Sequence, residues 1–235
     1  CLNEILYTFD KDKALSFYEQ YATNVFSNTW TSQLAVNYLY RVLDSKERFS
    51  KEKLYEVFAP QFNKAINARD MIEALAGTTS GTTYRYYGYY GGYYDKKPLT
   101  KEELDPRWAD LLCNYLAGSR VDNSFNTDAL MVLDRIEEDS ERVNYLITKA
   151  LDKSSAYTLE RLYRLIIKRN MPNKFEILYE SLAKMPKSNQ YYYRTIVEDD
   201  DFWKPFPKEY AQKFRELHEK TKLDIFKEIA WQIEK

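Results

Sequence analysis

The chain has 235 residues, of which 44% are hydrophobic and 30% charged, a composition typical of a folded globular protein with a sizeable core. Its 35 basic and 36 acidic side chains nearly balance, which argues against nucleic acid as the main partner because phosphate binding normally requires a basic surplus. No run of about 18 apolar residues occurs, so no membrane-spanning segment is predicted.

Turn-forming residues are scarce and unevenly placed. The chain has six glycines and seven prolines, and four of the glycines lie between positions 81 and 92. The remainder has few turn signals, which favours long helices over a β-sandwich or barrel. We therefore predict an all-α protein. The 22 tyrosines are unusual, and they indicate either amphipathic core edges or contact surfaces.

The sequence begins with a cysteine, and Cys113 is the only other one. A chain that begins in this way resembles a bacterial lipoprotein after removal of its signal peptide. The resemblance implies lipid attachment at Cys1, anchoring through acyl chains and a location in the cell envelope; the non-acidic Leu2 would favour the outer membrane, on its periplasmic or surface side. The alternatives are a start imposed by trimming of a longer chain, a Cys1–Cys113 disulfide, and a soluble cytoplasmic location.

The N-terminal part, residues 1–76, is predicted to be helical. Apolar residues recur at spacings of three and four, which predicts helices over about 12–26, 29–44, 51–60 and 61–76. Ser50 is a suitable N-cap for the third helix, and Pro60 is expected to break or kink it. Gly77 stands where a left-handed residue would end the fourth helix.

The segment 77–99 carries no helical period and is predicted to be a tyrosine- and glycine-rich loop inserted between two helical parts. Glycine lets the backbone turn, and tyrosine supplies stacking and hydrogen bonding, which suits a docking loop for a partner protein. The alternatives are a flap packed on its own domain and a stacking surface for a glycan. The candidate partner-binding residues of the loop are Tyr84, Arg85, Tyr86, Tyr87, Tyr89, Tyr90, Tyr93 and Tyr94.

The C-terminal part, residues 100–235, has a more regular pattern. Thr100 and Glu103 form a capping-box pattern, and Asp105-Pro106 is predicted to start a helix that ends at Gly118. Further helices are predicted to start near positions 126, 140, 155, 173 and 188, so a pair of them spans about 30 residues.

Over roughly residues 126–200, this spacing resembles the α-solenoids of the HEAT and tetratricopeptide kinds, although the signature residues of the tetratricopeptide repeat are not matched. The resemblance implies antiparallel helical hairpins stacked as an irregular α-solenoid, whose concave face binds other proteins. An irregular helical bundle is the alternative.

Two aromatic segments follow. Tyr191, Tyr192 and Tyr193 would point to different sides of a helix, so at least one of them is expected to contact a partner or a neighbouring element. The aromatic residues of segment 201–207 are expected to fill the core, with an exposed recognition segment as the alternative. A last helix is predicted over about 208–234, with a bend or break near 219–222 where its apolar stripe shifts.

No catalytic residue, cofactor or metal site is predicted. The acidic run from Glu198 to Asp201 lacks the alternating spacing of a calcium loop and is interpreted as a solvated helix end. His218 is the only histidine and cannot by itself form a zinc site or a Ser-His-Asp triad. Gly81 is followed by Thr82 and Thr83, so the lysine of a phosphate-binding loop is missing. An enzyme that uses paired carboxylates is the alternative.

We therefore expect a non-catalytic protein-interaction scaffold that is a lipid-anchored subunit of an envelope assembly. Its expected partners are other proteins of that assembly and, through the acyl chains, a membrane. The alternative from another class is a glycan- or peptide-binding module that uses exposed tyrosines.

Overall fold

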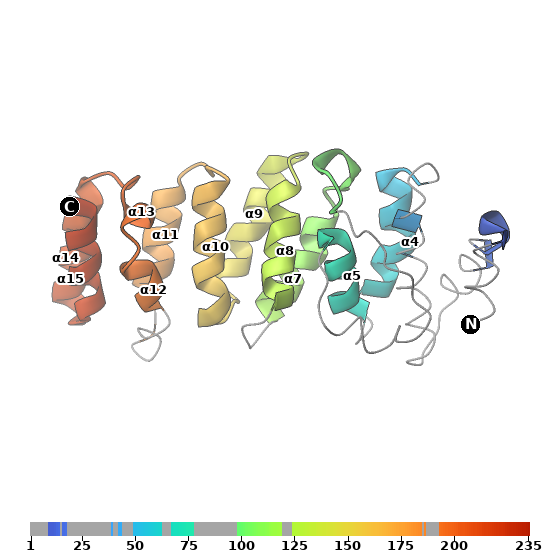
Figure 1. The fold of residues 1–235 in the computed structure, drawn as a ribbon. Helices are drawn as coiled ribbons and strands as arrows, with labels where there is room; N and C mark the ends of the chain where they lie inside the picture. The colour runs from blue at the N-terminus through green and yellow to red at the C-terminus, as the bar shows by residue number, and fades with distance from the viewer. Residues whose placement is uncertain are drawn as a thin grey trace. The chain divides into compact units, whose positions relative to one another are not determined.

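The computed structural model describes residues 9–14, 16–17, 39, 42–43, 49–62, 67–77, 98–118, 124–184, 186 and 193–235. Every regular element within these residues is a helix and none is a strand, so the predicted all-α class is confirmed (Figure 1). The segments predicted as helices over 12–26 and 29–44, and the loop 77–99, lie mostly outside the described residues.

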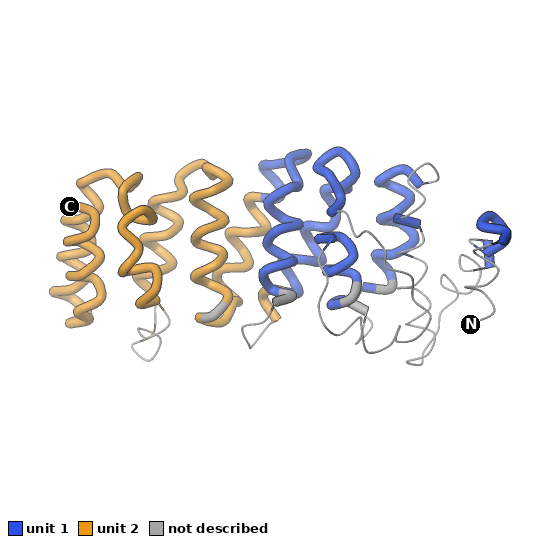
Figure 2. The backbone as a smooth tube through the Cα atoms, in the orientation of Figure 1, with its two compact units in different colours: residues 1–115, 123–143 blue, residues 116–122, 144–235 orange. Residues whose placement is uncertain are grey.

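The chain divides into two compact units (Figure 2). Two helices, α7 (Trp108–Gly118) and α9 (Ser140–Leu151), contribute their first part to unit 1 and their last part to unit 2. Unit 1 comprises Cys1–Tyr115 and Asn123–Val143, and unit 2 comprises Leu116–Asp122 and Asn144–Lys235.

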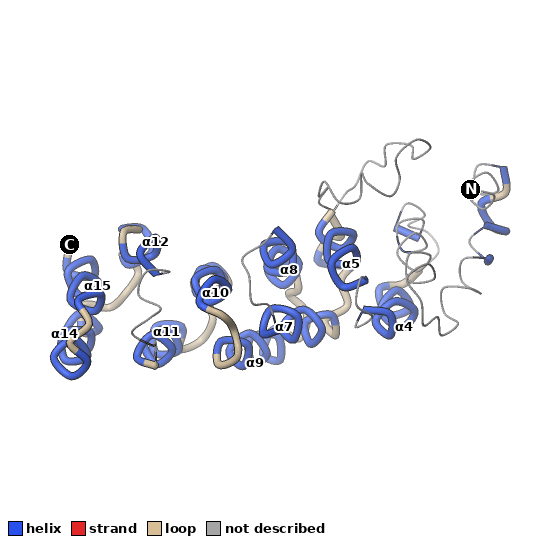
Figure 3. Tube along the Cα trace, turned by 90° about the horizontal axis from the view of Figure 1, so that it is seen from below, coloured by secondary structure: helices blue, strands red, loops and turns tan. Residues whose placement is uncertain are grey.

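Unit 1 holds its described helices in two layers. Helices α4 (Lys51–Phe62) and α7 form one layer, and α5 (Asn67–Ala76) and α8 (Ser124–Arg135) form the other (Figure 3). Within the first layer, Tyr55 and Phe62 pack against the fully buried Trp108, whose ring centroid lies 5.1 Å from that of Tyr55 and 6.2 Å from that of Phe62. Helix α5 packs against both α4 and α8, which closes the core of this unit.

The predicted helix ends of unit 1 have clear local causes. The Ser50 hydroxyl accepts a hydrogen bond from Lys53 N at 3.3 Å, and Gly77 ends α5 at a φ of 72°. Thr100 N donates to the Glu103 carboxylate at 2.9 Å, as the capping-box pattern predicts, and opens η1 (Lys101–Glu103). The predicted break at Pro60 is wrong, because α4 continues past it to Phe62; the kink stays a prediction.

Unit 2 also has two layers. Helices α10 (Ala156–Lys168), α12 (Arg194–Val197) and α15 (Asp224–Glu234) form one, and α11 (Lys174–Ala183) and α14 (Glu209–Thr221) form the other (Figure 3). A short helix, α13 (Asp200–Trp203), packs on α15. The most extensive pairing of this unit joins α14 and α15.

Left-handed residues lie between two pairs of successive helices in unit 2. Asn170 and Asn173 adopt φ of 50° and 55° between α10 and α11, a conformation that asparagine tolerates better than most residues. Lys222 adopts a φ of 59° between α14 and α15, so the break predicted near 219–222 is confirmed.

An aromatic cluster fills the core of unit 2. Phe202, Trp203 and Phe206 are at most 5% exposed, which confirms that segment 201–207 fills the core. The Trp203 indole donates a hydrogen bond to the Ile196 carbonyl oxygen at 2.8 Å, so its one polar group is satisfied. Phe206 also lies 4.7 Å from Phe175 of α11, measured between ring centroids.

Candidate partner-binding surfaces

Most residues predicted to contact a partner lie outside the described part of the chain. This holds for Cys1, for the loop residues between Tyr84 and Tyr94, and for Tyr191 and Tyr192. Their roles therefore stay predictions. Among the described residues, no helix is both long and apolar enough to cross a bilayer.

Tyr193 is described, and its side chain is fully buried in unit 2. Its ring stacks on that of Tyr163 with centroids 6.1 Å apart, and the Tyr163 hydroxyl lies 2.9 Å from Ser181 Oγ. Burial raises the pKa of Tyr163 to about 12, so both phenols remain neutral at physiological pH. Tyr193 belongs to the core and presents no surface to a partner, which corrects its prediction as a contact residue.

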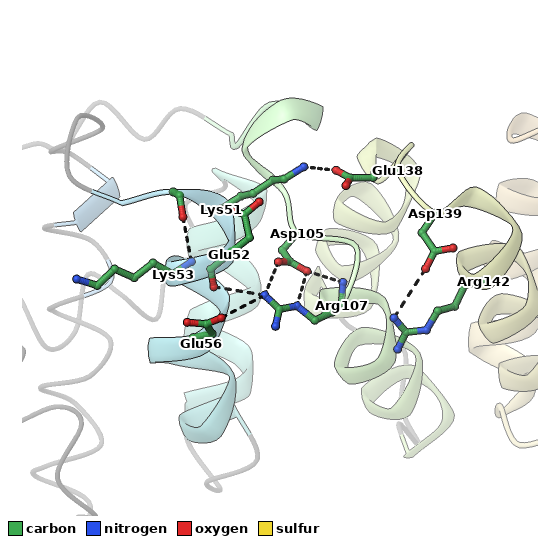
Figure 4. Close-up of polar contacts among 10 residues, drawn as sticks. Lys51, Glu52, Lys53, Glu56, Asp105, Arg107, Glu138, Asp139 and Arg142 are labelled. Atoms are coloured by element: carbon green, nitrogen blue, oxygen red, sulfur yellow. Dashed lines mark hydrogen bonds and ion pairs between the residues drawn. The ribbon is translucent and has the colours of Figure 1, made fainter.

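The surface of the α4–α7 layer in unit 1 carries a composite site, the Arg107 site, made of Tyr55, Asp105 and Arg107. Figure 4 shows Asp105 and Arg107. Arg107 Nε and Nη2 donate to the two oxygens of Asp105 at 2.9 and 2.7 Å, and the backbone N of Arg107 donates to Asp105 Oδ1 at 2.9 Å. The guanidinium carbon lies 4.4 Å from the centroid of the Tyr55 ring. A planar guanidinium is thus fixed by a bidentate ion pair and a cation–π contact together.

The Asp105-Pro106 turn before α7 positions this site. Asp105 is only 3% exposed, whereas 38% of the Arg107 side chain is exposed. Burial alone would raise the pKa of the Asp105 carboxyl, but the hydrogen bonds from Arg107 outweigh it and lower that pKa below its usual value. Glu56 adds a longer ion pair to Arg107, at 3.9 Å.

Other ion pairs connect the elements around the Arg107 site. Lys51 of α4 pairs with Glu138, and Lys101 of η1 pairs with Glu137 at 2.8 Å (Figure 4 shows the former). Because these pairs are largely exposed, each one contributes little to stability in salt. In each of these two pairs the positive and negative charges neutralise one another. The Arg107 site differs from them in combining a guanidinium with an aromatic ring.

The surface of the α11–α14 layer in unit 2 carries a second composite site, the Lys213 site, made of Glu176, Tyr179, Tyr210 and Lys213. Glu176 Oε2 accepts hydrogen bonds from Lys213 Nζ and from the Tyr210 hydroxyl, both at 2.8 Å. The same ammonium lies 4.4 Å from the Tyr210 ring centroid and 5.4 Å from that of Tyr179. Two aromatic faces and one carboxylate therefore converge on a single cation.

The electrostatics of the Lys213 site follow from these contacts. Lys213, and then Tyr210, lower the pKa of the Glu176 carboxyl by hydrogen bonding to its charged form. Glu176 in turn raises the pKa of the Lys213 ammonium. Burial and then the bond to Glu176 raise the pKa of the Tyr210 phenol. The lysine and the glutamate are therefore both charged near neutral pH.

Single large apolar side chains are also exposed. Tyr145 of α9 is 60% exposed with Lys149 Nζ 5.5 Å from its ring centroid, and Trp231 of α15 is 59% exposed with Lys235 Nζ at 5.3 Å. Exposed aromatic rings of this kind are frequent in protein contact surfaces. The other exposed apolar residues among those described are Phe9, Phe17 and Met131.

The residues considered for metal binding or catalysis have structural roles. Asp199 accepts hydrogen bonds from Asp201 N and Phe202 N at the start of α13, and it pairs with Arg164 at 2.6 Å. His218 Nδ1 lies 2.9 Å from the Leu223 carbonyl oxygen, between α14 and α15. Within the described ranges, no group of three or more potential metal ligands occurs.

Sequence reasoning did not identify either composite site. The sequence predicts Asp105 as a helix start but does not predict its pairing with Arg107. Glu176 meets Tyr210 and Lys213 across 34 and 37 residues of sequence, and no local pattern marks such a contact. Comparison with known proteins adds no further signal: no family model, no curated protein and no solved structure is significantly similar to this chain.

Proposed function

We propose that this chain is a non-catalytic protein-interaction scaffold whose helices stack as an irregular α-solenoid. The two-layer order within each unit supports the solenoid, because successive helices bury one face against the neighbouring layer and leave the other for contacts. In unit 2, the helices that follow one another change layers from α10 to α11 and from α14 to α15.

The observation that carries the proposal is the composite chemistry on one layer of each unit. The Arg107 site presents Tyr55 and Arg107 at the surface above the buried Asp105 carboxylate. The Lys213 site presents Tyr179, Lys213 and Glu176 there. Tyrosine and arginine are enriched among the residues that dominate binding energy at protein interfaces, because they combine a large contact area with directional hydrogen bonds. These sites therefore have the composition of contact surfaces.

Site-specific photo-crosslinking in the native host tests this function. A photoreactive phenylalanine analogue at Tyr55 or at Tyr145 is expected to crosslink to a discrete partner protein, since both side chains reach the surface. The same analogue at Tyr163, which is fully buried, is the matched control and should give no such product. A scaffold function is contradicted if the surface positions crosslink no more than the buried one.

A glycan-binding module is the second candidate, and the exposed rings of Tyr145 and Trp231 favour it, because sugars stack on such faces. Of the chain's four tryptophans, Trp108 and Trp203 are fully buried and would respond less, whereas Trp30 lies outside the described residues. Comparison with Trp231→Phe therefore separates the response of Trp231 from that of Trp30. Titration with glycans is then expected to change the tryptophan emission of wild-type protein but not that of Trp231→Phe. An unchanged emission spectrum in the wild type would remove this candidate.

A further inference from the structure

We infer that Glu176, Tyr179 and Tyr210 form a receptor for an ammonium group, and that the chain's own Lys213 occupies it until a lysine side chain of a partner protein replaces it. This inference rests on the proposed interaction function only in taking the partner to be a protein.

The receptor groups are held in place without Lys213. Tyr210 is 7% exposed, and its ring contacts those of Phe175 and Phe206 at centroid distances of 6.1 and 6.0 Å. Tyr179 packs edge-on against the buried Phe214 at 5.3 Å. These rings would therefore keep their positions when the cation leaves, which is the preorganisation that a binding site needs.

The carboxylate is also oriented independently of the cation. Glu176 Oε2 accepts a hydrogen bond from the Tyr210 hydroxyl at 2.8 Å, and Tyr210 is fixed by its own packing. One negative charge and two ring faces are therefore aimed at the same point, and this combination recognises alkylammonium groups in proteins. The preferred ligand is a primary ammonium, because it both donates to the carboxylate and contacts the rings.

Lys213 has the properties of a replaceable occupant. Its side chain is 40% exposed, and within the described part of the chain it forms an ion pair with Glu176 alone. A lysine stem regains considerable rotamer freedom on release, and exposed ion pairs of lysine are weak in salt. An incoming lysine would form the same contacts, while Lys213 would return to solvent, so the exchange conserves charge at the site.

A purely structural role for Lys213, as a tie between α11 and α14, makes a different prediction. A tie can be removed, but nothing then binds in its place. A receptor binds a small ammonium once the resident lysine is gone, and the two interpretations are therefore separable with purified protein.

The experiment uses the full chain with Lys213→Met, which keeps most of the stem and removes the ammonium. The probe is Nα-acetyl-lysine methylamide, and its binding is followed by the upfield NMR shift of its ε-methylene protons above the tyrosine rings. We expect Lys213→Met to bind the probe roughly tenfold more tightly than the wild type, because intramolecular competition is removed. The norleucine analogue of the probe, which lacks the ammonium, should not bind.

Three further variants complete the test. Adding Glu176→Gln or Tyr179→Ala to Lys213→Met should abolish the gain. Lys204→Met is the matched control, because Lys204 forms an exposed ion pair with Asp201 at 2.6 Å but lacks a ring contact among the described residues. It should bind the probe no better than the wild type.

The inference is overturned if folded Lys213→Met protein, verified by circular dichroism, binds the probe no more tightly than Lys204→Met. Lys213→Gln replaces Lys213→Met if the latter fails to fold, with the same two outcomes. Because the probe needs no partner protein, failure here leaves the crosslinking test of the scaffold function unaffected, and failure of crosslinking leaves this receptor intact.

Discussion

The Arg107 site of unit 1 and the Lys213 site of unit 2 combine the same three kinds of group but are held together differently. Arg107 is bound by a buried carboxylate two residues earlier, within the turn that precedes α7. Lys213 is bound by a half-exposed carboxylate on another helix. The carboxylate that binds the first cation belongs to the same turn, although Tyr55 of α4 adds a ring contact, whereas the carboxylate that binds the second comes from another helix. The second cation can therefore leave without loss of a turn.

The largest effect on stability is expected from the loss of Asp105, the buried carboxylate that distinguishes the Arg107 site from the Lys213 site. Asp105→Ala removes the acceptor of three hydrogen bonds from Arg107, one of which comes from its backbone N in the turn before α7. We expect a loss of about 2 kcal/mol in the free energy of unfolding, measured by urea denaturation. Glu56→Gln is the control, because Glu56 pairs with Arg107 only at 3.9 Å and should show no measurable change. Equal effects of the two variants would mean that the buried carboxylate has no special role.

The pH dependence of stability sharpens the same comparison. The folded pKa of Asp105 is lowered, so its contribution is complete above the unfolded value of about 3.9 and is lost as the pH falls through the lower folded pKa. The difference in unfolding free energy between wild type and Asp105→Asn should therefore be constant near neutral pH and shrink below about pH 4. A difference that persists unchanged in acid would show that the charge of Asp105 is irrelevant.

A smaller effect is expected from the two buried tyrosines of unit 2. Tyr163→Phe removes a hydroxyl bonded to Ser181 and should lower the unfolding free energy by about 1 kcal/mol. The buried Tyr193 hydroxyl faces the Tyr163 hydroxyl but forms no hydrogen bond of good geometry among the described groups, so Tyr193→Phe should cost less stability than Tyr163→Phe. Thermal denaturation of the pair of variants distinguishes them. A larger loss for Tyr193→Phe would show that its hydroxyl is satisfied in solution.

The same contrast between local and tertiary structure determines how much the sequence could predict. The sequence predicts the Ser50 cap, the Thr100–Glu103 capping box, the helix end at Gly77 and the break near 219–222, because each depends on neighbouring residues. It does not predict the Lys213 site, since that requires knowing which faces of α11 and α14 meet. Tyr193 was misassigned for the same reason: a tyrosine triplet shows that some rings must face inward, but the packing of α10 and α12 determines which one.

The smallest expected effect on stability, that of Lys213→Met, decides whether the comparison is correct. If the Lys213 site is a receptor with a replaceable occupant, removal of the ammonium should leave the denaturation midpoint unchanged, because the rings of Tyr179 and Tyr210 stay packed and Glu176 keeps its bond from Tyr210. Glu176→Gln should likewise leave the denaturation midpoint almost unchanged. The Lys213–Glu176 ion pair should add almost nothing to the salt dependence of the wild-type midpoint.

A marked loss of stability in Lys213→Met, comparable to that of Asp105→Ala, would instead make Lys213 a structural tie like Arg107. Both sites would then serve to hold neighbouring helices together. The Lys213 site would not be a receptor for an ammonium group. Both variants are measured in the same full-length chain and by the same denaturation. The losses of unfolding free energy in Lys213→Met and Asp105→Ala can therefore be compared directly, whatever the stability of the wild type.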